Sequence, residues 1–146
     1  MQNYPHNYAV TAVANRDGNV DLTSEGLTGI RSAPPAEFGG PGDLWSPETL
    51  LIAAVADCFI LTFRAIAGAS KFDWISLQCE AEGTLDRIDN VTRFTEIKLL
   101  AILDVPQATD EQKAMRLLEK SEHACLITNS LKSSSHLDAT VRIAKG

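Results

Sequence analysis

The longest apolar stretch of the chain runs over residues 50–69, directly after the segment Ser-Pro-Glu-Thr at residues 46–49. Serine suits a helix N-cap, proline suits the first helical position, and glutamate favours the positive end of the helix dipole. We expect this helix to run to about Ala67, with Gly68 as its stop. Apolar residues cover nearly every face, and such a helix is buried all round. In a domain this small, that pattern suggests that a second chain covers one side.

Two later segments, Trp74–Glu82 and His136–Ile143, alternate between apolar and polar residues. Alternation of this kind is typical of a half-buried β-strand. Between them, residues 91–105 predict a second long strand, joined to the first through the dipeptide Asp89-Asn90. These segments predict one sheet with an apolar inner face.

Shorter signals place the remaining elements. Residues 109–112 read Thr-Asp-Glu-Gln, a capping box that opens an amphipathic helix, and residues 125–131 favour a short helix after it. Near the N-terminus, residues 7–13 predict a strand, the Asp-Gly sequence within 15–19 predicts a tight turn, and residues 20–22 begin the return strand.

A stretch rich in proline and glycine, residues 31–43, predicts a loop before the long helix. The resulting order is strands, long helix, two strands, helices and a last strand. This order predicts an α+β fold in which helices pack against one sheet. The length of 146 residues fits a single domain spanning residues 1–146.

Composition narrows the possible functions. The chain is 45% hydrophobic with a net charge of −6, which is typical of a globular protein and argues against binding to nucleic acid or anionic lipid. Asp57 and Arg64 interrupt the apolar stretch, so a buried helix is favoured over a membrane span. The N-terminal residues do not resemble a signal peptide, and three cysteines without one indicate a reducing compartment, the cytoplasm.

The cysteines are the candidate reactive groups. Cys58 lies in the middle of the predicted helix, where an unpaired cysteine usually acts as a small hydrophobic residue, and Cys79 lies on the inner face of a strand. Cys125 stands where a short helix would begin, and the positive end of that helix would favour its thiolate. Cysteine and histidine do not occur at zinc-type spacings, so we expect neither a metal nor a cofactor.

Two motifs resemble the family of osmotically inducible protein C (OsmC) and organic hydroperoxide resistance protein (Ohr). Residues 46–58 are similar to the family segment in which a cysteine follows a glutamate by ten residues. Residues 123–131 look like the family's second cysteine segment. The similarity extends from about Tyr8 to the C-terminus. It implies an OsmC-like fold with an antiparallel or mixed sheet, a long central buried helix and an intertwined homodimer.

The resemblance also implies a reaction and its residues. Cys58 would attack an organic hydroperoxide and become a sulfenic acid, and Cys125 would capture it as a disulfide. Glu48 matches the glutamate that orients an arginine. That arginine is Arg16 by resemblance to the Ohr branch, with Arg31 as its rival. A dithiol reductant, for which the family suggests a lipoyl-type donor, would regenerate the thiols.

The chemistry is consistent with these roles. Burial raises the pKa of a thiol, so a buried Cys58 needs a nearby cation, and a buried arginine in turn needs a carboxylate such as Glu48. Ten residues of helix span about 15 Å, so Glu48 and Cys58 of one chain lie too far apart to share a site. We therefore expect active sites shared between two chains. Phe59 and Phe63 would favour organic hydroperoxides over hydrogen peroxide.

A second hypothesis remains open. Leu126 follows the second cysteine where the family commonly has proline, and Asp57 is an unusual anion before the first cysteine. These two departures favour an OsmC-like protein without enzymatic activity, which would bind a small apolar ligand at the dimer interface. A purely structural role would leave both cysteines inert.

Overall fold

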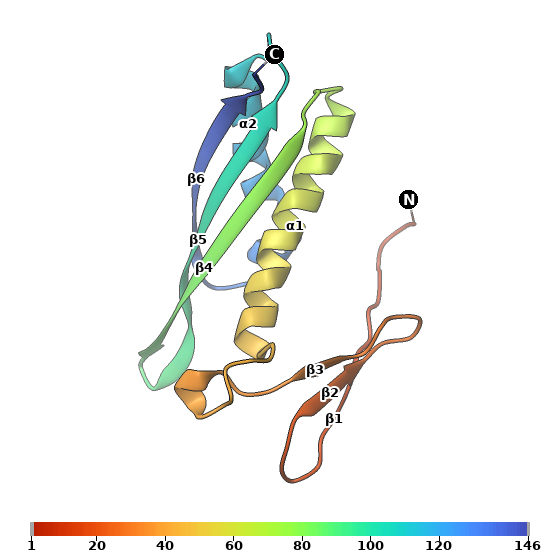
Figure 1. Cartoon of the computed structure of the whole chain (residues 1–146), viewed down its shortest axis with the longest axis vertical. Helices are drawn as coiled ribbons and strands as arrows, with labels where there is room; N and C mark the ends of the chain where they lie inside the picture. Colours follow the sequence, from red (N-terminus) through yellow and green to blue (C-terminus); the bar gives the residue numbers. More distant parts are fainter. Residues whose placement is uncertain (1, 146) are drawn as a thin grey trace. The chain divides into compact units, whose positions relative to one another are not determined.

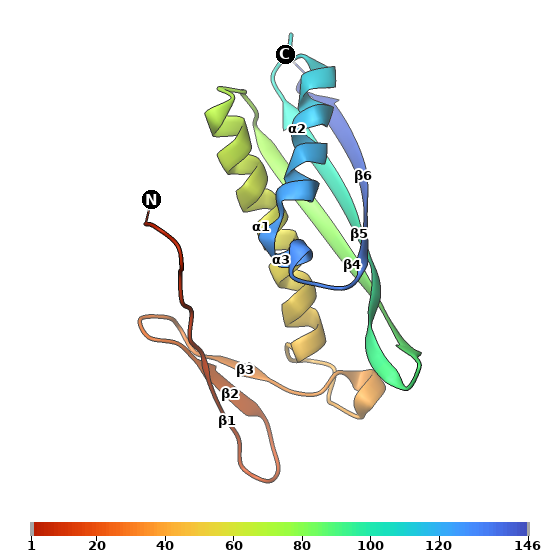
Figure 2. The ribbon, with the colours of Figure 1, turned by 180° about the vertical axis from the view of Figure 1, so that it is seen from behind.

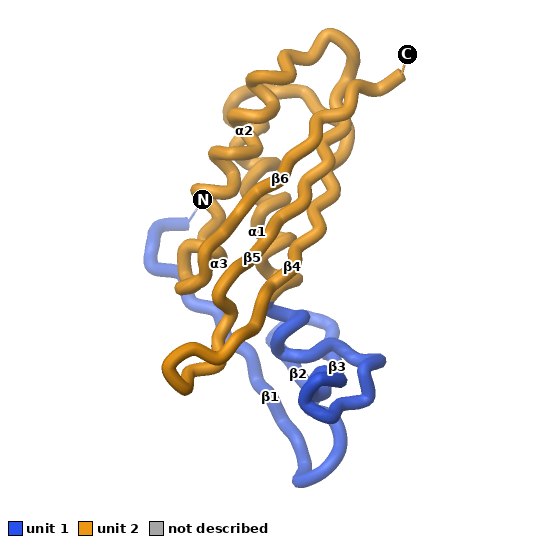
Figure 3. The backbone as a smooth tube through the Cα atoms, turned by 90° about the vertical axis from the view of Figure 1, so that its left-hand side faces the viewer, with its two compact units in different colours: residues 1–51 blue, residues 52–146 orange. Residues whose placement is uncertain are grey.

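The computed structural model describes residues 2–145. The chain forms two compact units, residues 1–51 and residues 52–146, which Figure 3 colours separately. We call them the N-terminal and C-terminal units and describe each by itself. The prediction of one domain stays a prediction.

The N-terminal unit contains a three-stranded antiparallel sheet in the order β1 (Thr11–Val13), β2 (Val20–Thr23) and β3 (Ile30–Ser32). Gly18 takes a φ of 96° in the turn between β1 and β2, as the Asp-Gly signal predicts. Strand β1 is shorter than predicted, and β3 enters the predicted loop. A three-residue strand is too short to show alternation, so only its pairing with β2 reveals it.

The C-terminal unit is built on the sheet β4 (Ser76–Ile88), β5 (Val91–Val105) and β6 (Ser134–Ile143), in that order. Strands β4 and β5 are antiparallel, and Asp89 and Asn90 turn between them with φ values of 52° and 64°. Positive φ at both turn residues matches the twist of a two-residue hairpin. Strands β5 and β6 are parallel, so the sheet is mixed.

Three α-helices complete the fold: α1 (Pro47–Ala69), α2 (Glu111–Ala124) and α3 (Leu126–Asn129). Ser46 caps α1, because its Oγ accepts a hydrogen bond of 3.1 Å from the amide of Thr49. The predicted stop at Gly68 is wrong. The helix continues to Ala69, and Lys71 ends it with a φ of 51° while its amide donates to the carbonyl of Gly68.

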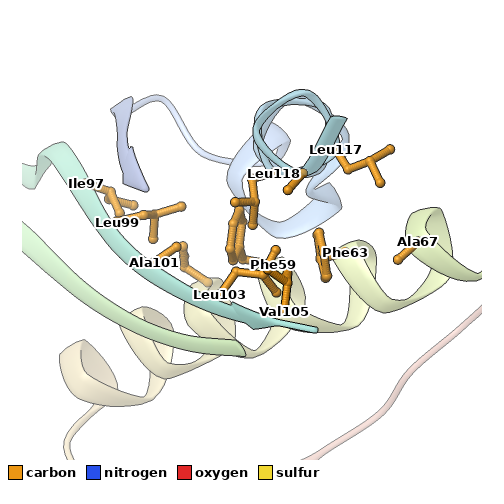
Figure 4. Close-up of a cluster of buried hydrophobic side chains, with 12 residues drawn as sticks. Phe59, Phe63, Ala67, Ile97, Leu99, Ala101, Leu103, Val105, Leu117 and Leu118 are labelled. Carbon is orange, nitrogen blue, oxygen red and sulfur yellow. The ribbon is translucent and has the colours of Figure 1, made fainter. Parts of the chain in front are cut away.

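Helices α1 and α2 cover one face of the β4–β5–β6 sheet (Figures 1 and 2). Their contact face holds the hydrophobic core, in which Phe59 and Phe63 of α1 lie among Leu103 and Val105 of β5 and Leu118 of α2 (Figure 4). All five side chains are fully buried. This packing confirms the α+β class with helices against a sheet.

Within its own chain, helix α1 is buried on one face only, and the expected burial of another face by a second chain stays a prediction. Four of its 23 residues are fully buried: Val55, Phe59, Phe63 and Ala67. On another face, Leu61 is 50% exposed. The helix is long and apolar enough to cross a membrane, but its buried residues make it a core helix of the C-terminal unit.

Candidate functional site

The structure brings Cys58 and Cys125 together in the C-terminal unit, close enough for each thiol to influence the pKa of the other. Cys58 lies midway along α1 and is half-buried. Cys125 is fully buried at the point where α2 ends and α3 begins. Both thiols are free. Two residues separated by 67 positions in the sequence thus form one site.

The environment of Cys58 favours its thiolate. Burial raises the pKa of the Cys58 thiol, but hydrogen bonds to the sulfur outweigh burial and lower the pKa below the usual value for cysteine. The donors are the backbone of Ile127, the Cys125 thiol, the Thr62 hydroxyl and the backbone of Leu126. The Thr62 oxygen lies 3.7 Å from the Cys58 sulfur. Cys58 is therefore the more reactive of the two thiols.

Cys125 has the opposite character. Burial raises its pKa, and the Cys58 sulfur raises it further, while Thr128 lowers it through its hydroxyl and its backbone. The Thr128 hydroxyl donates to the Cys125 sulfur over 3.4 Å. The expectation that the start of α3 activates Cys125 is wrong, because burial raises the Cys125 pKa by more than these bonds lower it. The backbone of Leu126 and Ile127, at the start of α3, lowers the pKa of Cys58 instead. Cys125 is therefore the less acidic of the two thiols.

Cys79 on β4 is a third free cysteine. Its pKa is raised to about 11, chiefly by burial and also by the charges of Cys125 and Glu80. It packs against the hydrophobic core, so its environment suits a structural side chain. Within residues 2–145, His, Cys, Asp and Glu side chains do not form a group of three or more that could hold a metal ion.

The other predicted site residues belong to the N-terminal unit. Glu48 lies in the first turn of α1, and its Oε2 atom is buried without a hydrogen-bond partner among the described residues. Arg16 is exposed in the turn between β1 and β2. Its rival Arg31 lies on β3 and forms an exposed ion pair of 3.4 Å with Asp21.

Two threonines that were not predicted as site residues form hydrogen bonds with the thiols. Thr62 follows Cys58 by four residues on α1, and Thr128 follows Cys125 by three residues on α3. Side chains three or four residues apart are neighbours on a helix, so this spacing could have identified both. Phe59 and Phe63 are fully buried in the core, so they do not form the exposed surface beside Cys58. The exposed apolar residue next to Cys125 is Leu126, at 66%.

Comparison with known proteins assigns the chain to a family. The family model "OsmC-like protein" matches residues 40–140. The chain is 29% identical over 119 residues to the uncharacterized protein YmaD of Bacillus subtilis, covering 77% of each chain. It is 29% identical over 93 residues to peroxiredoxin OsmC of Escherichia coli, covering 64% of each. It is 26% identical over 137 residues to an organic hydroperoxide resistance protein of Xanthomonas axonopodis, covering 92% of this chain and 91% of the relative.

Solved structures share the fold. An OsmC-like protein of unknown function from Vibrio cholerae superposes with a TM-score of 0.83 at 16% identity, covering 93% of this chain and all of the other. An organic hydroperoxide resistance protein from Legionella pneumophila gives a TM-score of 0.74 at 24% identity, covering 96% and 99% of the two chains. The match of the family model over both cysteine segments, together with this shared fold, shows that the chain belongs to the OsmC-like family.

Proposed function

We propose that this chain is a thiol peroxidase that reduces organic hydroperoxides to alcohols. The observation that carries the proposal is the Cys58 thiol, whose pKa is lowered by hydrogen bonds from Cys125, Thr62 and the start of α3. A thiolate is the nucleophile in such chemistry, so a site that favours the thiolate suits attack on peroxide. Relatives named as a peroxiredoxin and as an organic hydroperoxide resistance protein support this role.

The reaction proceeds in two steps. The Cys58 thiolate attacks one peroxide oxygen and breaks the O–O bond, and with one proton the products are a Cys58 sulfenic acid and an alcohol. The Cys125 thiol then attacks the sulfenic sulfur, which forms the Cys58–Cys125 disulfide and releases water. A dithiol reductant, for which the family suggests a lipoyl-type donor, reduces that disulfide and returns both thiols.

Arg16 and Glu48 complete the proposed site. An arginine stays charged and can donate hydrogen bonds to the thiolate and to the peroxide oxygens. The buried Glu48 Oε2 has a free lone pair for such an arginine, and Arg31 is already paired with Asp21. Glu48 precedes Cys58 by ten residues of α1, or about 15 Å. We therefore infer a homodimer in which each site combines residues of both chains.

A hydroperoxide titration tests the reaction. Reduced protein is titrated with cumene hydroperoxide, and its disulfides are mapped by mass spectrometry. We expect one Cys58–Cys125 disulfide for each peroxide consumed, because the two thiols lie close enough to influence each other's pKa. With excess dithiol, turnover should be lost in Cys58→Ser.

Cys79→Ser is the matched control, since Cys79 is free but has a raised pKa; it should keep its turnover. Undiminished turnover in Cys58→Ser would remove the proposal. If the titration yields no Cys58–Cys125 disulfide while the protein binds the apolar peroxide unchanged, the non-enzymatic ligand-binding hypothesis is favoured. Comparable rates with hydrogen peroxide would remove the preference for organic substrates.

A further inference from the structure

The two thiols of the site differ in their access to solvent. In the reduced form, Cys125 is fully buried, whereas Cys58 is half-buried. The backbone of Cys125 is also held on both sides, because its amide donates to the carbonyl of Glu122 and its carbonyl accepts from the amide of Asn129. These bonds tie Cys125 to α2 and α3, so its sulfur is fixed inside the C-terminal unit. Cys58 is therefore the thiol that a solute can reach.

Access and leaving-group chemistry favour different sulfurs when a Cys58–Cys125 disulfide is reduced. A thiolate can attack either sulfur, and the other sulfur then leaves as a thiolate. The thiol with the lower pKa leaves faster, so chemistry alone favours attack on Cys125 and release of Cys58. A reductant must also reach the sulfur that it attacks, and the Cys125 sulfur is fully buried. Access therefore favours attack on Cys58.

Attack on Cys58 makes Cys125 the leaving group. Burial disfavours a charged sulfur, and it raises the Cys125 pKa. The Thr128 hydroxyl lies where it can offset this cost, since it donates to the Cys125 sulfur over 3.4 Å. Thr128 is itself buried, so this bond is shielded from water. Hydrogen bonds to a charged acceptor are about twice as strong as neutral ones, so the bond strengthens as the thiolate forms.

We propose that a dithiol regenerates the site by attacking the Cys58 sulfur, and that the Thr128 hydroxyl stabilises the Cys125 thiolate that leaves. The proposal rests on the disulfide of the proposed function and assigns the residues of its reduction. It gives Thr128, a side chain three residues beyond the second cysteine, a part in the reaction.

Regeneration takes two thiol–disulfide exchanges. The first thiolate of the dithiol forms a bond to the Cys58 sulfur, the Cys58–Cys125 bond breaks, and the Cys125 thiolate takes up a proton. The second thiolate of the dithiol attacks the dithiol sulfur that is bound to Cys58, which closes a cyclic disulfide and releases the Cys58 thiolate. The dithiol loses two electrons and the protein gains them. The second exchange has the better leaving group, because the Cys58 pKa is lowered.

The two threonines of the site then act in different halves of the cycle. The Thr62 oxygen lies 3.7 Å from the Cys58 sulfur and favours the thiolate that attacks peroxide. The Thr128 hydroxyl bonds to the Cys125 sulfur and favours the thiolate that leaves during reduction. Loss of the Thr128 hydroxyl should therefore slow reduction of the disulfide while Cys58 of the reduced protein keeps most of its reactivity.

Reduction of a preformed disulfide tests the role of Thr128. The disulfide of the full-length protein is formed with diamide, which requires no peroxidase activity, and is then reduced with dithiothreitol. Mass spectrometry of acid-quenched samples follows the loss of the disulfide. We expect Thr128→Val, which keeps the shape of the side chain without its hydroxyl, to be reduced about tenfold more slowly. Thr128→Ser keeps the hydroxyl and should be reduced within about threefold of the original rate.

Thr140→Val is the matched control, because Thr140 is an exposed threonine of β6 among neighbours whose side chains pack against the core on the other face. It should be reduced at the original rate. Alkylation of Cys58 by iodoacetamide in reduced Thr128→Val should change by less than about threefold. A purely structural role of Thr128 would instead displace both thiols and slow both reactions together.

A monothiol identifies the sulfur that is attacked. The oxidised protein is treated briefly with excess 2-mercaptoethanol, quenched with acid and digested with pepsin at acid pH. We expect mass spectrometry to find the mercaptoethanol adduct on Cys58 and a free thiol at Cys125. This measurement uses the unmodified chain, so it tests the attack on Cys58 even where a variant does not fold.

The proposal is overturned if the adduct is on Cys125, or if folded Thr128→Val is reduced as fast as the original protein. It is also overturned if diamide does not form the Cys58–Cys125 disulfide. Circular dichroism verifies that each variant is folded. Failure of the proposed function gives a different result: peroxide would leave both thiols reduced, while the disulfide made with diamide would still be reduced through Cys58 with the help of Thr128.

Discussion

Two faces of helix α1 have different surroundings, although both carry large apolar residues. One face contributes four fully buried residues to the core: Val55, Phe59, Phe63 and Ala67. The other face exposes half of Leu61 together with Asp57 and Arg64. The first face packs with β5 and α2 of its own chain in the core, whereas the second is exposed. An apolar helix face is stabilised when it is buried from water. Only the three-dimensional arrangement shows whether the same chain buries it.

The largest effect is expected on the buried face. Phe63→Ala removes a side chain that is fully buried and whose ring packs edge-on against Trp74 at 5.3 Å between centroids. We expect the free energy of unfolding to fall by about 3–5 kcal/mol, because a large cavity is left in the core. Urea denaturation measures this change in the free energy of unfolding. Phe38→Ala, the same substitution at a side chain that is 61% exposed, should change it by only about 0.5 kcal/mol. Equal losses of unfolding free energy in the two variants would contradict the expectation that the burial of the side chain sets the loss.

A smaller effect of a different kind is expected on the exposed face. Leu61→Ala removes apolar surface that the second copy would cover, so we expect a dimer dissociation constant raised about tenfold, with little change in the far-UV circular dichroism. Sedimentation over a concentration series measures it. Leu100→Ala on β5, where the leucine is 40% exposed, is the control and should leave association unchanged. If both variants associate alike, the face of α1 around Leu61 is not the interface.

The smallest effect is expected at the border of the two faces, where Cys58 lies. Thr62→Val removes one of the hydrogen bonds that lower the Cys58 pKa, so the pKa should rise. At neutral pH less thiolate is then present, and alkylation by iodoacetamide should slow by about threefold to tenfold. A pH series should show the rate curve of the variant displaced to higher pH.

Thr128→Val is its counterpart, because Thr128 donates to Cys125 rather than to Cys58. The alkylation curve of Cys58 should move less in this variant than in Thr62→Val. An identical displacement in both variants would mean that the Thr62 hydroxyl does not act directly on the Cys58 sulfur.

Much of the fold was predictable from patterns that are local. Residues 91–105 were predicted as a strand and form β5, and the turn at Asp89-Asn90 is where the dipeptide indicated. The end of α1 was not predictable from Gly68. That glycine remains helical, and the left-handed residue is Lys71, a residue type without a turn signal. The parallel pairing of β5 with β6 also lacks a local signal, since side-chain alternation is the same in parallel and antiparallel strands.

The sequence by itself identified the two cysteine motifs and the long apolar helix, since motif spacing and hydrophobic pattern are properties of the chain. Tertiary structure alone decided how the two thiols differ. Cys58 and Cys125 are the same residue type, but groups of α1 and of residues 125–127 lower the pKa of Cys58, and burial dominates at Cys125. A pKa depends on the balance of desolvation and donors around the sulfur. That balance exists only once α1 and α3 are packed together.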